Sequence, residues 1–403
     1  MNRNLWINSS LGLVGQVLAF GSLFLPIFLG NFEQLSVQVF VSAIVSVLVI
    51  AITSGFTSQY PVLQNEQELR TLYKFTVSAI CLLTLVGISV SWLTSLTGGQ
   101  SSPLMISGTF LLFAQCLDIL ATTLLVRLNK PGIVALKRLV YGLSSILVTA
   151  LVSFFWNTRE SLVWAGAFSF AVGAAYVFVV LRYNPFPVEV FLLKNQFAHF
   201  KENFFTHVKI FSSGILDNLF VQFPSIAIFS LGPLAPAWAV VTRIGGGVST
   251  IGLQLITPHI EARYSDGIRQ RNQLGLKASL KIGTKFAIAL SSITGVGIFL
   301  SLLAFQSELN LSASQIYFLL ITGVIFWGSI LWQVPKSRLL VFAGGVNQKI
   351  IWSISRAGLA LLLILFFSNE NILVGLGVIA FTWAISYELI LRVRTSKQSK
   401  GNV

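Results

Sequence analysis

The sequence predicts an all-α polytopic membrane protein of about 12 transmembrane helices, arranged as two six-helix lobes. Three observations support this prediction. Of the 403 residues, 55% are hydrophobic and only 10% are charged, which is more apolar surface than a soluble core can hide. The apolar residues come in runs of about 20, the length at which a helix crosses a bilayer. Finally, the basic residues lie almost entirely in every second connection between these runs.

Twelve apolar runs are long enough to cross a hydrocarbon core of about 30 Å. The first run starts close to the N-terminus and has no signal-peptide cleavage region, so it is predicted to be a retained helix. The two cysteines, Cys81 and Cys116, lie inside apolar runs and are expected to be free core thiols. The spans are expected near residues 8–30, 36–57, 75–97, 104–126, 139–156, 161–181, 210–232, 234–257, 282–305, 313–334, 350–368 and 372–391.

The distribution of Lys and Arg predicts the orientation of these spans. Apart from Arg159, Arg243 and Arg356, 24 of the 27 basic residues fall on one side. Because basic loops stay on the cytoplasmic side, both termini are predicted to be cytoplasmic. The net charge of +14 is thus explained by topology, and no nucleic acid is expected as a partner.

A faint internal repeat predicts the domain organisation. Residues 7–30 and 210–232 both open with I-x-S-S and close with L-G. Six helices separate the two starts, so the lobes would be related by a pseudo-two-fold axis along the membrane normal. The predicted parts are an N-terminal lobe (1–182), a cytoplasmic linker (183–209), a C-terminal lobe (210–392) and a basic cytoplasmic tail (393–403). The linker mixes Phe, Lys and Glu, which fits either an amphipathic surface helix or a plain connection.

Five ionisable residues fall inside the predicted spans: Asp118, Asp217, Arg243, Arg356 and Glu388. A charge in hydrocarbon costs several kcal/mol, so such residues usually face a bundle interior or a wet cavity. At about 1.5 Å per residue, Asp217 lies roughly 11 Å and Arg243 roughly 16 Å from the cytoplasmic edge, so the two are predicted to pair. Arg356 and Glu388 lie shallower and are predicted to form a structural pair.

Several amides accompany these charges on the first, second, seventh and eighth spans. They either hold helices together or hydrogen-bond a ligand in a polar interior. The triplet Gly245 to Gly247, directly after Arg243, similarly marks either a bend beside a cavity or close packing of a neighbouring helix. The candidate amides are Gln16, Gln38, Asn218, Gln222 and Gln254.

Two stretches of the chain resemble a known family. LDILATTLLVRLNKPGIVALKRLVYGLSSILVTALV is similar to that family's fourth helix, basic loop and fifth helix. SSGILDNLFVQFPSIAIFSLGPLAPAWAVVTRI, followed by LITPHIEARYSDG, is similar to its seventh and eighth helices, including Asp217, Arg243 and Pro258. The family is that of the polysaccharide (O-antigen type) flippases, in the multidrug/oligosaccharidyl-lipid/polysaccharide (MOP) exporter superfamily.

The resemblance implies a flippase of the bacterial inner (cytoplasmic) membrane, acting in cell-envelope polysaccharide biosynthesis. It would carry undecaprenyl-pyrophosphate-linked oligosaccharide repeat units to the outer leaflet by alternating access. The first, second, seventh and eighth helices would then line a central cavity, with Arg243 and Asp217 on its wall. A polysaccharide polymerase and chain-length proteins become candidate partners. Asp217 and Asp118 become candidates for coupling to a H⁺ or Na⁺ gradient, with no other cofactor.

Other functions are weighed on the same residues. A small-molecule cation antiporter of the same superfamily is the nearest alternative, although an Arg in the cavity suits an anion better. A polymerase or glycosyltransferase is disfavoured because every outer connection is short, so no enzyme is expected. His199, His207 and His259 lack zinc-like spacing, and no metal site is expected. A purely structural or receptor role stays open.

Overall fold

The computed structural model is all-helical in the residues that it describes. These are residues 3–399 except 54–55, 57–59, 61–65, 97–101, 129, 157, 186–203, 228–230, 233, 271, 310 and 368–369. The chain divides into two compact units, Met1–Ile215 and Leu216–Val403. Each unit is described by itself.

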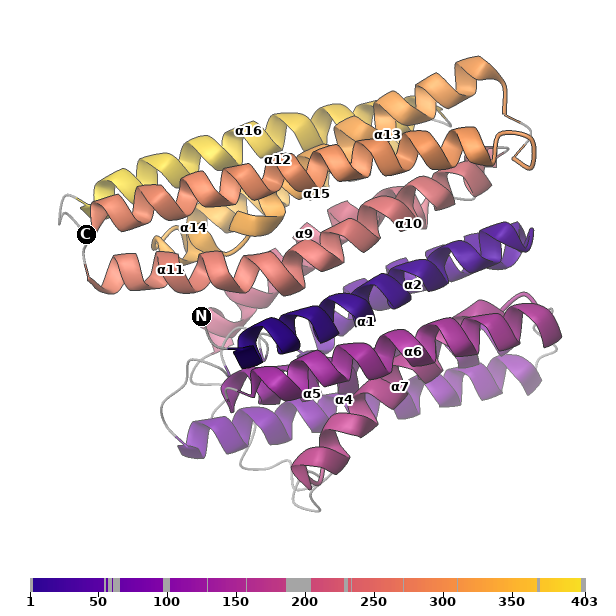
Figure 1. Cartoon of the computed structure of the whole chain (residues 1–403), viewed down its shortest axis with the longest axis horizontal. Coiled ribbons are helices and arrows are strands. Elements are labelled where there is room, and N and C mark those ends of the chain that lie inside the picture. The colour runs from indigo at the N-terminus through magenta and orange to yellow at the C-terminus, as the bar shows by residue number, and fades with distance from the viewer. Residues whose placement is uncertain are drawn as a thin grey trace. The chain divides into compact units, whose positions relative to one another are not determined.

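Six long helices form unit 1 (Figure 1). Each of them overlaps one of the first six predicted spans. Their N-terminal ends on the basic side include up to nine residues more than the apolar run, because a helix can continue into water once it leaves the membrane. The helices are α1 (Arg3–Phe28), α2 (Phe32–Thr53), α4 (Glu66–Leu96), α5 (Ser102–Arg127), α6 (Pro131–Phe155) and α7 (Ser161–Leu181).

Unit 2 contains the other six predicted spans, with the start of α9 lying before the unit boundary. The eighth predicted span lies in a helical segment that continues without a break from residue 235 to 269. This segment is formed by α10, a π-helical turn η3 and α11. The elements are α9 (Phe204–Ile226), α10 (Ala235–Ile251), η3 (Gly252–Ile256), α11 (Thr257–Arg269), α12 (Gln273–Ala304), α13 (Ala313–Gln333), η4 (Val334–Lys336), α14 (Leu339–Phe342), α15 (Val346–Phe366) and α16 (Glu370–Ser399).

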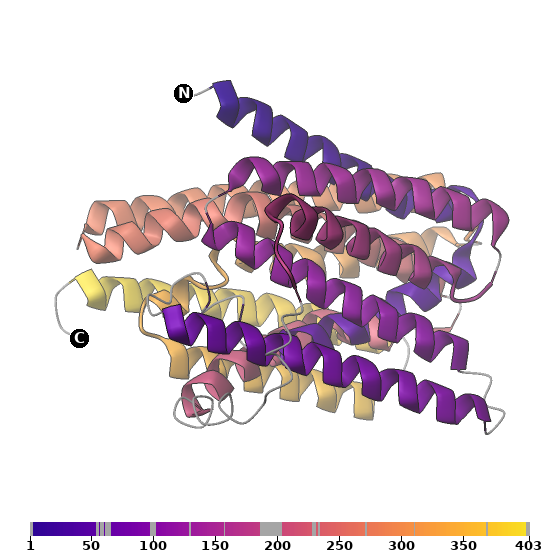
Figure 2. The same ribbon diagram turned by 90° about the horizontal axis from the view of Figure 1, so that it is seen from below.

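Helix α1 packs along α6 in unit 1 (Figures 1 and 2). The two backbones touch at Gly15 and Gly142, where a Cβ on Gly142 would lie 2.1 Å from the carbonyl oxygen of Gly15. Close backbone approach between small residues is a usual way to pack membrane helices, because hydrophobic association cannot act between helices in lipid. The remaining helices of the unit surround a core that includes Leu111, Cys116 and Val163.

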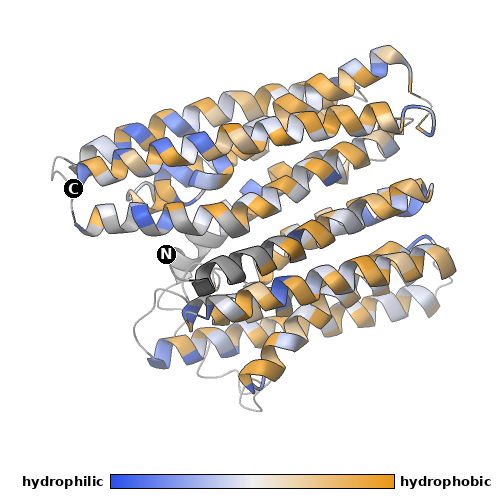
Figure 3. Cartoon of the chain, viewed as in Figure 1, coloured by the Kyte–Doolittle hydropathy of each residue, from blue (hydrophilic) through white to orange (hydrophobic). Residues whose placement is uncertain are grey.

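In unit 2, α13 packs against α10, α12 and α16. A second core is formed by residues of α11, α12, α14, α15 and α16 and includes Tyr264, Leu339, Trp352 and Tyr387. Nine helices in the described part of the chain are long and apolar enough to cross a membrane. Apolar residues cover much of the length of α12 and α13 (Figure 3), which is the surface that lipid would contact. The protein is thus a multi-span membrane protein.

The described residues differ from two predicted parts of the chain, the linker and the tail. Most of the predicted linker, residues 186–203, lies outside the described residues, and with it the proposed amphipathic helix. The tail predicted from residue 393 begins as a continuation of α16, which ends at Ser399. Both cysteines are free, as predicted.

Candidate functional site

Most of the predicted intramembrane charges belong to three ion-pair clusters. The Asp217 cluster consists of Asp217, Gln333, Lys349, Ser353 and Arg356 in unit 2. The Glu388 cluster, also in unit 2, consists of Glu388, Lys336 and Arg392. The Asp118 cluster consists of Asp118, Lys137 and Thr122 in unit 1.

The carboxylate of Asp217, on α9, accepts hydrogen bonds from three side chains of α15. Arg356 Nη2 donates to Oδ1 at 2.9 Å, and Ser353 Oγ donates to the same oxygen at 2.7 Å. Lys349 Nζ lies 2.5 Å from Oδ2. Residues 349, 353 and 356 are spaced by four and three, so a helix presents all three on one face. The cluster therefore joins α9 to α15.

Aromatic rings cover the two cations of this cluster. The guanidinium of Arg356 lies 4.4 Å from the ring centre of Phe220 and 4.2 Å from that of Trp352. Lys349 Nζ lies 4.4 Å from the ring centre of Trp352 and 5.0 Å from that of Tyr387. Cation–π contact partly replaces the water that these charges lose on burial. The side chains of Arg356 and Lys349 are only 3% and 8% exposed, against 25% for Asp217.

The sequence predicts Arg243 as the partner of Asp217, and the structure corrects this pairing. Depth along the two helices places these residues within reach, but depth says nothing about which way each side chain turns around its helix axis. Asp217 turns towards α15. Arg243 lies half-buried on α10, eight residues after the start of that helix.

The first of the three glycines after the Arg243–Ile244 pair, Gly245, is closely packed. A Cβ on Gly245 would lie 2.1 Å from Cδ2 of Trp327, on α13. A Cβ on Gly246 would lie 3.8 Å from that ring, at ordinary contact distance. Helix α10 continues through all three glycines, and the irregular turn comes later, at η3. Of the two interpretations of the triplet, the packing one therefore holds at Gly245.

The expected pair of Arg356 and Glu388 is also corrected, because the two belong to separate clusters. Arg356 pairs with Asp217, while Glu388 pairs with Lys336 at 2.5 Å and with Arg392 at 2.9 Å. The side chain of Lys336 is fully buried, whereas that of Arg392 is 64% exposed. Trp332 adds a cation–π contact to Lys336 at 4.7 Å.

Asp118 pairs with Lys137 of α6, at 2.7 Å between Oδ1 and Nζ. Lys137 also donates to the carbonyl oxygen of Asp118 at 3.2 Å and to the hydroxyl of Thr122. One carboxylate faces one ammonium here, so this cluster has no net charge. It ties α5 to α6.

The predicted amides are in varied settings. Gln38 donates from Nε2 to the carbonyl oxygen of Leu162 at 2.9 Å, which joins α2 to α7. Gln16 is buried on α1, while Asn218 and Gln222 are half-buried on α9. Gln254 lies in η3. At Gln38, at least, the amide joins two helices, which is one of its two predicted uses.

Sequence reasoning missed three buried lysines, Lys137, Lys336 and Lys349, because it counted them as loop residues. Lys137 and Lys349 lie in the first turns of α6 and α15, where a hydropathy window cannot separate a loop from a helix, and Lys336 lies in the short turn η4 directly after α13. Pro131 was the available signal for Lys137, because Pro is favoured at the first position of a helix. It opens α6 and places Lys137 almost two turns inside. Lys349 had no comparable signal.

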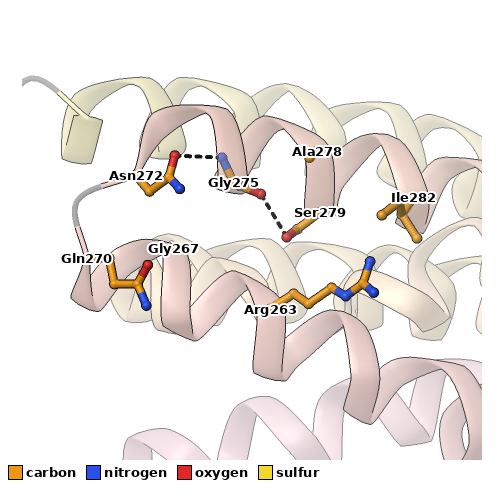
Figure 4. Close-up of a pocket in the computed structure, with 8 residues that line it drawn as sticks. All are labelled: Arg263, Gly267, Gln270, Asn272, Gly275, Ala278, Ser279 and Ile282. Carbon is orange, nitrogen blue, oxygen red and sulfur yellow. Dashed lines mark hydrogen bonds between the residues drawn. The ribbon is translucent and has the colours of Figure 1, made fainter. Parts of the chain in front are cut away.

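A pocket of about 300 Å³ lies apart from these clusters, between α11 and α12 (Figure 4). Its polar lining includes Arg263, Gln270, Asn272 and Ser279. Asn272 caps α12 by accepting from the backbone N–H of Gly275, and Ser279 donates to the carbonyl oxygen of that residue. Its lining includes none of the predicted site residues.

The ion-pair clusters determine which charged side chains between the helices are available to a ligand. Each of the three carboxylates, Asp118, Asp217 and Glu388, is already paired with at least one lysine of the protein. Two of the clusters have more cations than carboxylates. A cation arriving from outside would have to displace a built-in lysine or arginine, whereas an anion would meet an excess of positive charge.

Comparisons with known proteins identify the fold. The sequence matches no protein-family model and no curated protein. Similar solved structures include a MATE multidrug transporter in complex with a small-molecule ligand, at 16% identity over 98% of this chain and 95% of that one, with a TM-score of 0.57. Another is an inward-facing multidrug resistance MATE family transporter of the MOP superfamily, at 14% identity over 99% and 94%, with a TM-score of 0.53.

A third is a MATE protein in complex with MaL6, at 16% identity over 98% of this chain and 96% of that one, with a TM-score of 0.52. At these identities the likeness concerns the fold, and it extends over nearly the full length of each partner. The predicted fold class is confirmed: the chain has the all-α, two-lobed fold of the MATE transporters in the MOP superfamily.

Proposed function

We propose that the protein is a flippase that moves a lipid-linked oligosaccharide, anchored through pyrophosphate, from the cytoplasmic to the outer leaflet by alternating access. The fold supports a transporter of the MOP superfamily. The anionic cargo is supported by one observation above all, the Asp217 cluster, in which two buried cations, Arg356 and Lys349, face a single carboxylate. The sequence resemblance to O-antigen type flippases points to the same cargo.

The cargo chemistry fits the residues proposed to bind it. Pyrophosphate is anionic, and the planar donor fork of an arginine suits phosphate oxygens. Arg243, half-buried on α10, is proposed for this contact. Asn218 and Gln222 on α9, together with Gln16, Gln38 and Gln254, are proposed to exchange hydrogen bonds with sugar hydroxyls. The lipid chain is proposed to contact the apolar surface of the helices.

A multidrug antiporter that exports organic cations is the second candidate. Solved structures with this fold are described as multidrug transporters. Within this chain, however, an organic cation would need a carboxylate to pair with. The two oxygens of Asp217 already accept from Arg356, Ser353 and Lys349, so this candidate requires one of those contacts to break.

Reconstitution in liposomes tests the two candidates directly. Labelled undecaprenyl-pyrophosphate-linked oligosaccharide and the fluorescent organic cation ethidium are supplied separately, and movement of each across the bilayer is measured. We expect the lipid-linked glycan to move and ethidium to stay. Ethidium transport with no glycan flipping would favour the antiporter. In cells, loss of the gene should leave lipid-linked repeat units on the cytoplasmic side.

Arg243 variants test the proposed phosphate contact. Arg243→Ala should reduce flipping at least tenfold, because a charged hydrogen bond to phosphate contributes about 1.5–3 kcal/mol. Arg243→Lys should retain part of the activity, because an ammonium keeps the charge without the planar fork. Arg70→Ala is the control, since Arg70 is 75% exposed on α4. Equal flipping in Arg243→Ala and in the control would exclude the contact.

A further inference from the structure

We propose that Lys349 exchanges a proton with water and thereby switches the Asp217 cluster between net charge +1 and zero. The inference deepens the proposed function, because a proton taken up and released inside a transporter can couple cargo movement to a proton gradient. It names a coupling residue different from Asp217, which the sequence had suggested for that role.

The charge count in the cluster leads to this residue. Arg356 and Lys349 carry two positive charges, and Asp217 carries one negative charge. An uncompensated charge among buried side chains in a membrane is costly, because low dielectric disfavours the charged form. Either a group in the cluster changes its protonation, or an anion must enter.

Only one protonation change brings the cluster to zero. Arg356 cannot lose its proton in a protein. Protonation of Asp217 would raise the net charge to +2, and its oxygens already accept from three donors. Loss of a proton from Lys349 leaves the neutral pair of Asp217 and Arg356, at 2.9 Å. Lys349 is therefore the group whose titration relieves the excess charge.

The surroundings of Lys349 are compatible with this exchange. Among the described residues, the charged groups that face it are Asp217 on α9 and Arg356 on its own helix, and the rings of Trp352 and Tyr387 lie beside it. The hydroxyl of Tyr387, on α16, donates to the carbonyl oxygens of Lys336 and Ser337. These partners hold it away from Asp217, so it does not replace Lys349 as a donor.

The position of Lys349 along α15 also favours it. It is the fourth residue of α15, directly after the turn that contains Gly344 and Gly345, so it lies close to the end of its helix. Arg356 lies two turns deeper, with ring centres 4.4 and 4.2 Å from its guanidinium. An anion would need room beside these covered groups, whereas loss of a proton adds no atom.

The step itself is a simple proton transfer. One Nζ–H bond of Lys349 breaks, the proton passes to water, and the electron pair remains on Nζ. The neutral amine keeps two N–H bonds, one of which still donates to Asp217 Oδ2. No oxidant, reductant or metal takes part.

The Asp118 cluster provides a matched comparison within the same chain. It contains one carboxylate and one lysine, with Lys137 as buried as Lys349. A neutral residue in place of Lys137 would leave Asp118 without a counter-charge. The two lysines are thus expected to respond in opposite ways to the same substitution.

Thermal unfolding of the purified full-length protein across pH 6–9 tests the proposal. The buffers contain gluconate, and the variants are Lys349→Gln, Lys349→Arg, Lys137→Gln and Lys137→Arg. As pH rises, the Tm of the wild type should rise relative to that of Lys349→Arg, because only the wild type can lose the excess charge. Lys349→Gln should be at least as stable as the wild type at pH 6, whereas Lys137→Gln should lose about 5 °C or more.

Three results would overturn the proposal. The first is that Lys349→Arg keeps the pH dependence of the wild type. The second is that Lys349→Gln loses as much stability as Lys137→Gln, since Lys349 would then be needed as a permanent charge. The third is that exchanging gluconate for chloride stabilises the wild type and Lys349→Arg equally at low pH, because an anion would then balance the cluster.

A transport measurement then separates this proposal from the proposed function. In liposomes with a pH gradient, Lys349→Arg should flip the lipid-linked glycan without the acceleration that the gradient gives to the wild type. If the Tm of the wild type shows the expected pH dependence but no glycan moves, the proposed cargo fails and the proton site stands. If the glycan moves and its rate in both proteins depends equally on the gradient, the proton site fails.

Discussion

Asp217 shows how a single carboxylate is held in the interior of a membrane protein. It receives three hydrogen bonds from one helix, and rings on α9, α15 and α16 cover the cations that supply two of them. Buried ion pairs of this kind contribute little net stability when complete, because desolvation offsets their attraction. Their removal is costly because it leaves the partner charge alone.

Asp217→Asn tests this asymmetry. The variant leaves two buried cations without a carboxylate, so it should lose about 3–5 kcal/mol of stability. Ser353→Ala removes one neutral hydrogen-bond donor to Asp217 Oδ1, so this variant should lose only about 1 kcal/mol of stability. Chemical denaturation of both proteins in the same detergent provides the measurement. Equal losses in the two variants would contradict the charge argument.

Glu261 on α11 offers a pH test outside the spans. Burial raises the pKa of this carboxyl, and Arg338, whose guanidinium lies 3.7 Å away, only partly opposes the effect. The folded protein therefore binds this proton more tightly than the unfolded chain does, and stability is lost as pH rises through the raised pKa. Glu261→Gln should raise the Tm at pH 8, and the gain should vanish towards pH 4.

The exposed Glu66 is the control for that measurement, since Glu66→Gln should leave the Tm unchanged at both pH values. A lower Tm for Glu261→Gln across the whole pH range would mean that the ion pair with Arg338 outweighs burial. The side chain of Arg338 is half-exposed, so water screens that pair and the burial effect should dominate.

At the scale of elements, the crossing of α10 and α13 depends on small residues. Gly245 receives the ring of Trp327, and a Cβ on Gly323 would lie 2.7 Å from a methyl of Val241. Each helix thus has a glycine at the point where the other helix has a larger side chain. Gly245 is thus a packing position, and α10 continues through the glycine triplet.

A pair of alanine substitutions tests this crossing. Gly245→Ala places a methyl inside the ring of Trp327 and should lose about 1–3 kcal/mol through overpacking. Gly246→Ala meets the same ring at contact distance and gains helix propensity, so it should be neutral or slightly stabilising. Comparable losses in both would argue for a need for backbone flexibility rather than for space.

At the scale of the whole molecule, the predicted orientation can be tested on either side of one helix. Ser307 follows α12 and Gln270 precedes it. In a background without the native cysteines, Ser307→Cys should react with a membrane-impermeant maleimide in intact cells. Gln270→Cys should react only after permeabilisation, because the basic connection around it is predicted to be cytoplasmic. The reverse pattern would invert the topology.

Each of the twelve spans predicted from hydropathy overlaps a helical segment, and nine helices of the described part are long and apolar enough to cross a membrane, because a helix that crosses lipid must be apolar over about 20 residues whatever it packs against. Hydropathy was less accurate at the helix ends. α4 and α12 begin nine residues before their predicted spans, and α16 ends eight residues after its own. In water a helix needs no apolar run, so the hydropathy signal ends before the helix does. The same limit hid Lys137 and Lys349 among loop residues.

The sequence by itself therefore determined the fold class, the order of the helices and the presence of rare charges among apolar residues. The tertiary structure decided which of those charges meet. Depth placed Asp217 level with Arg243, yet Asp217 pairs with Lys349 and Arg356. Partner choice depends on how each helix is rotated about its axis, and that rotation is set by packing between segments far apart in the chain, such as Trp327 on Gly245. The local sequence pattern does not encode this rotation.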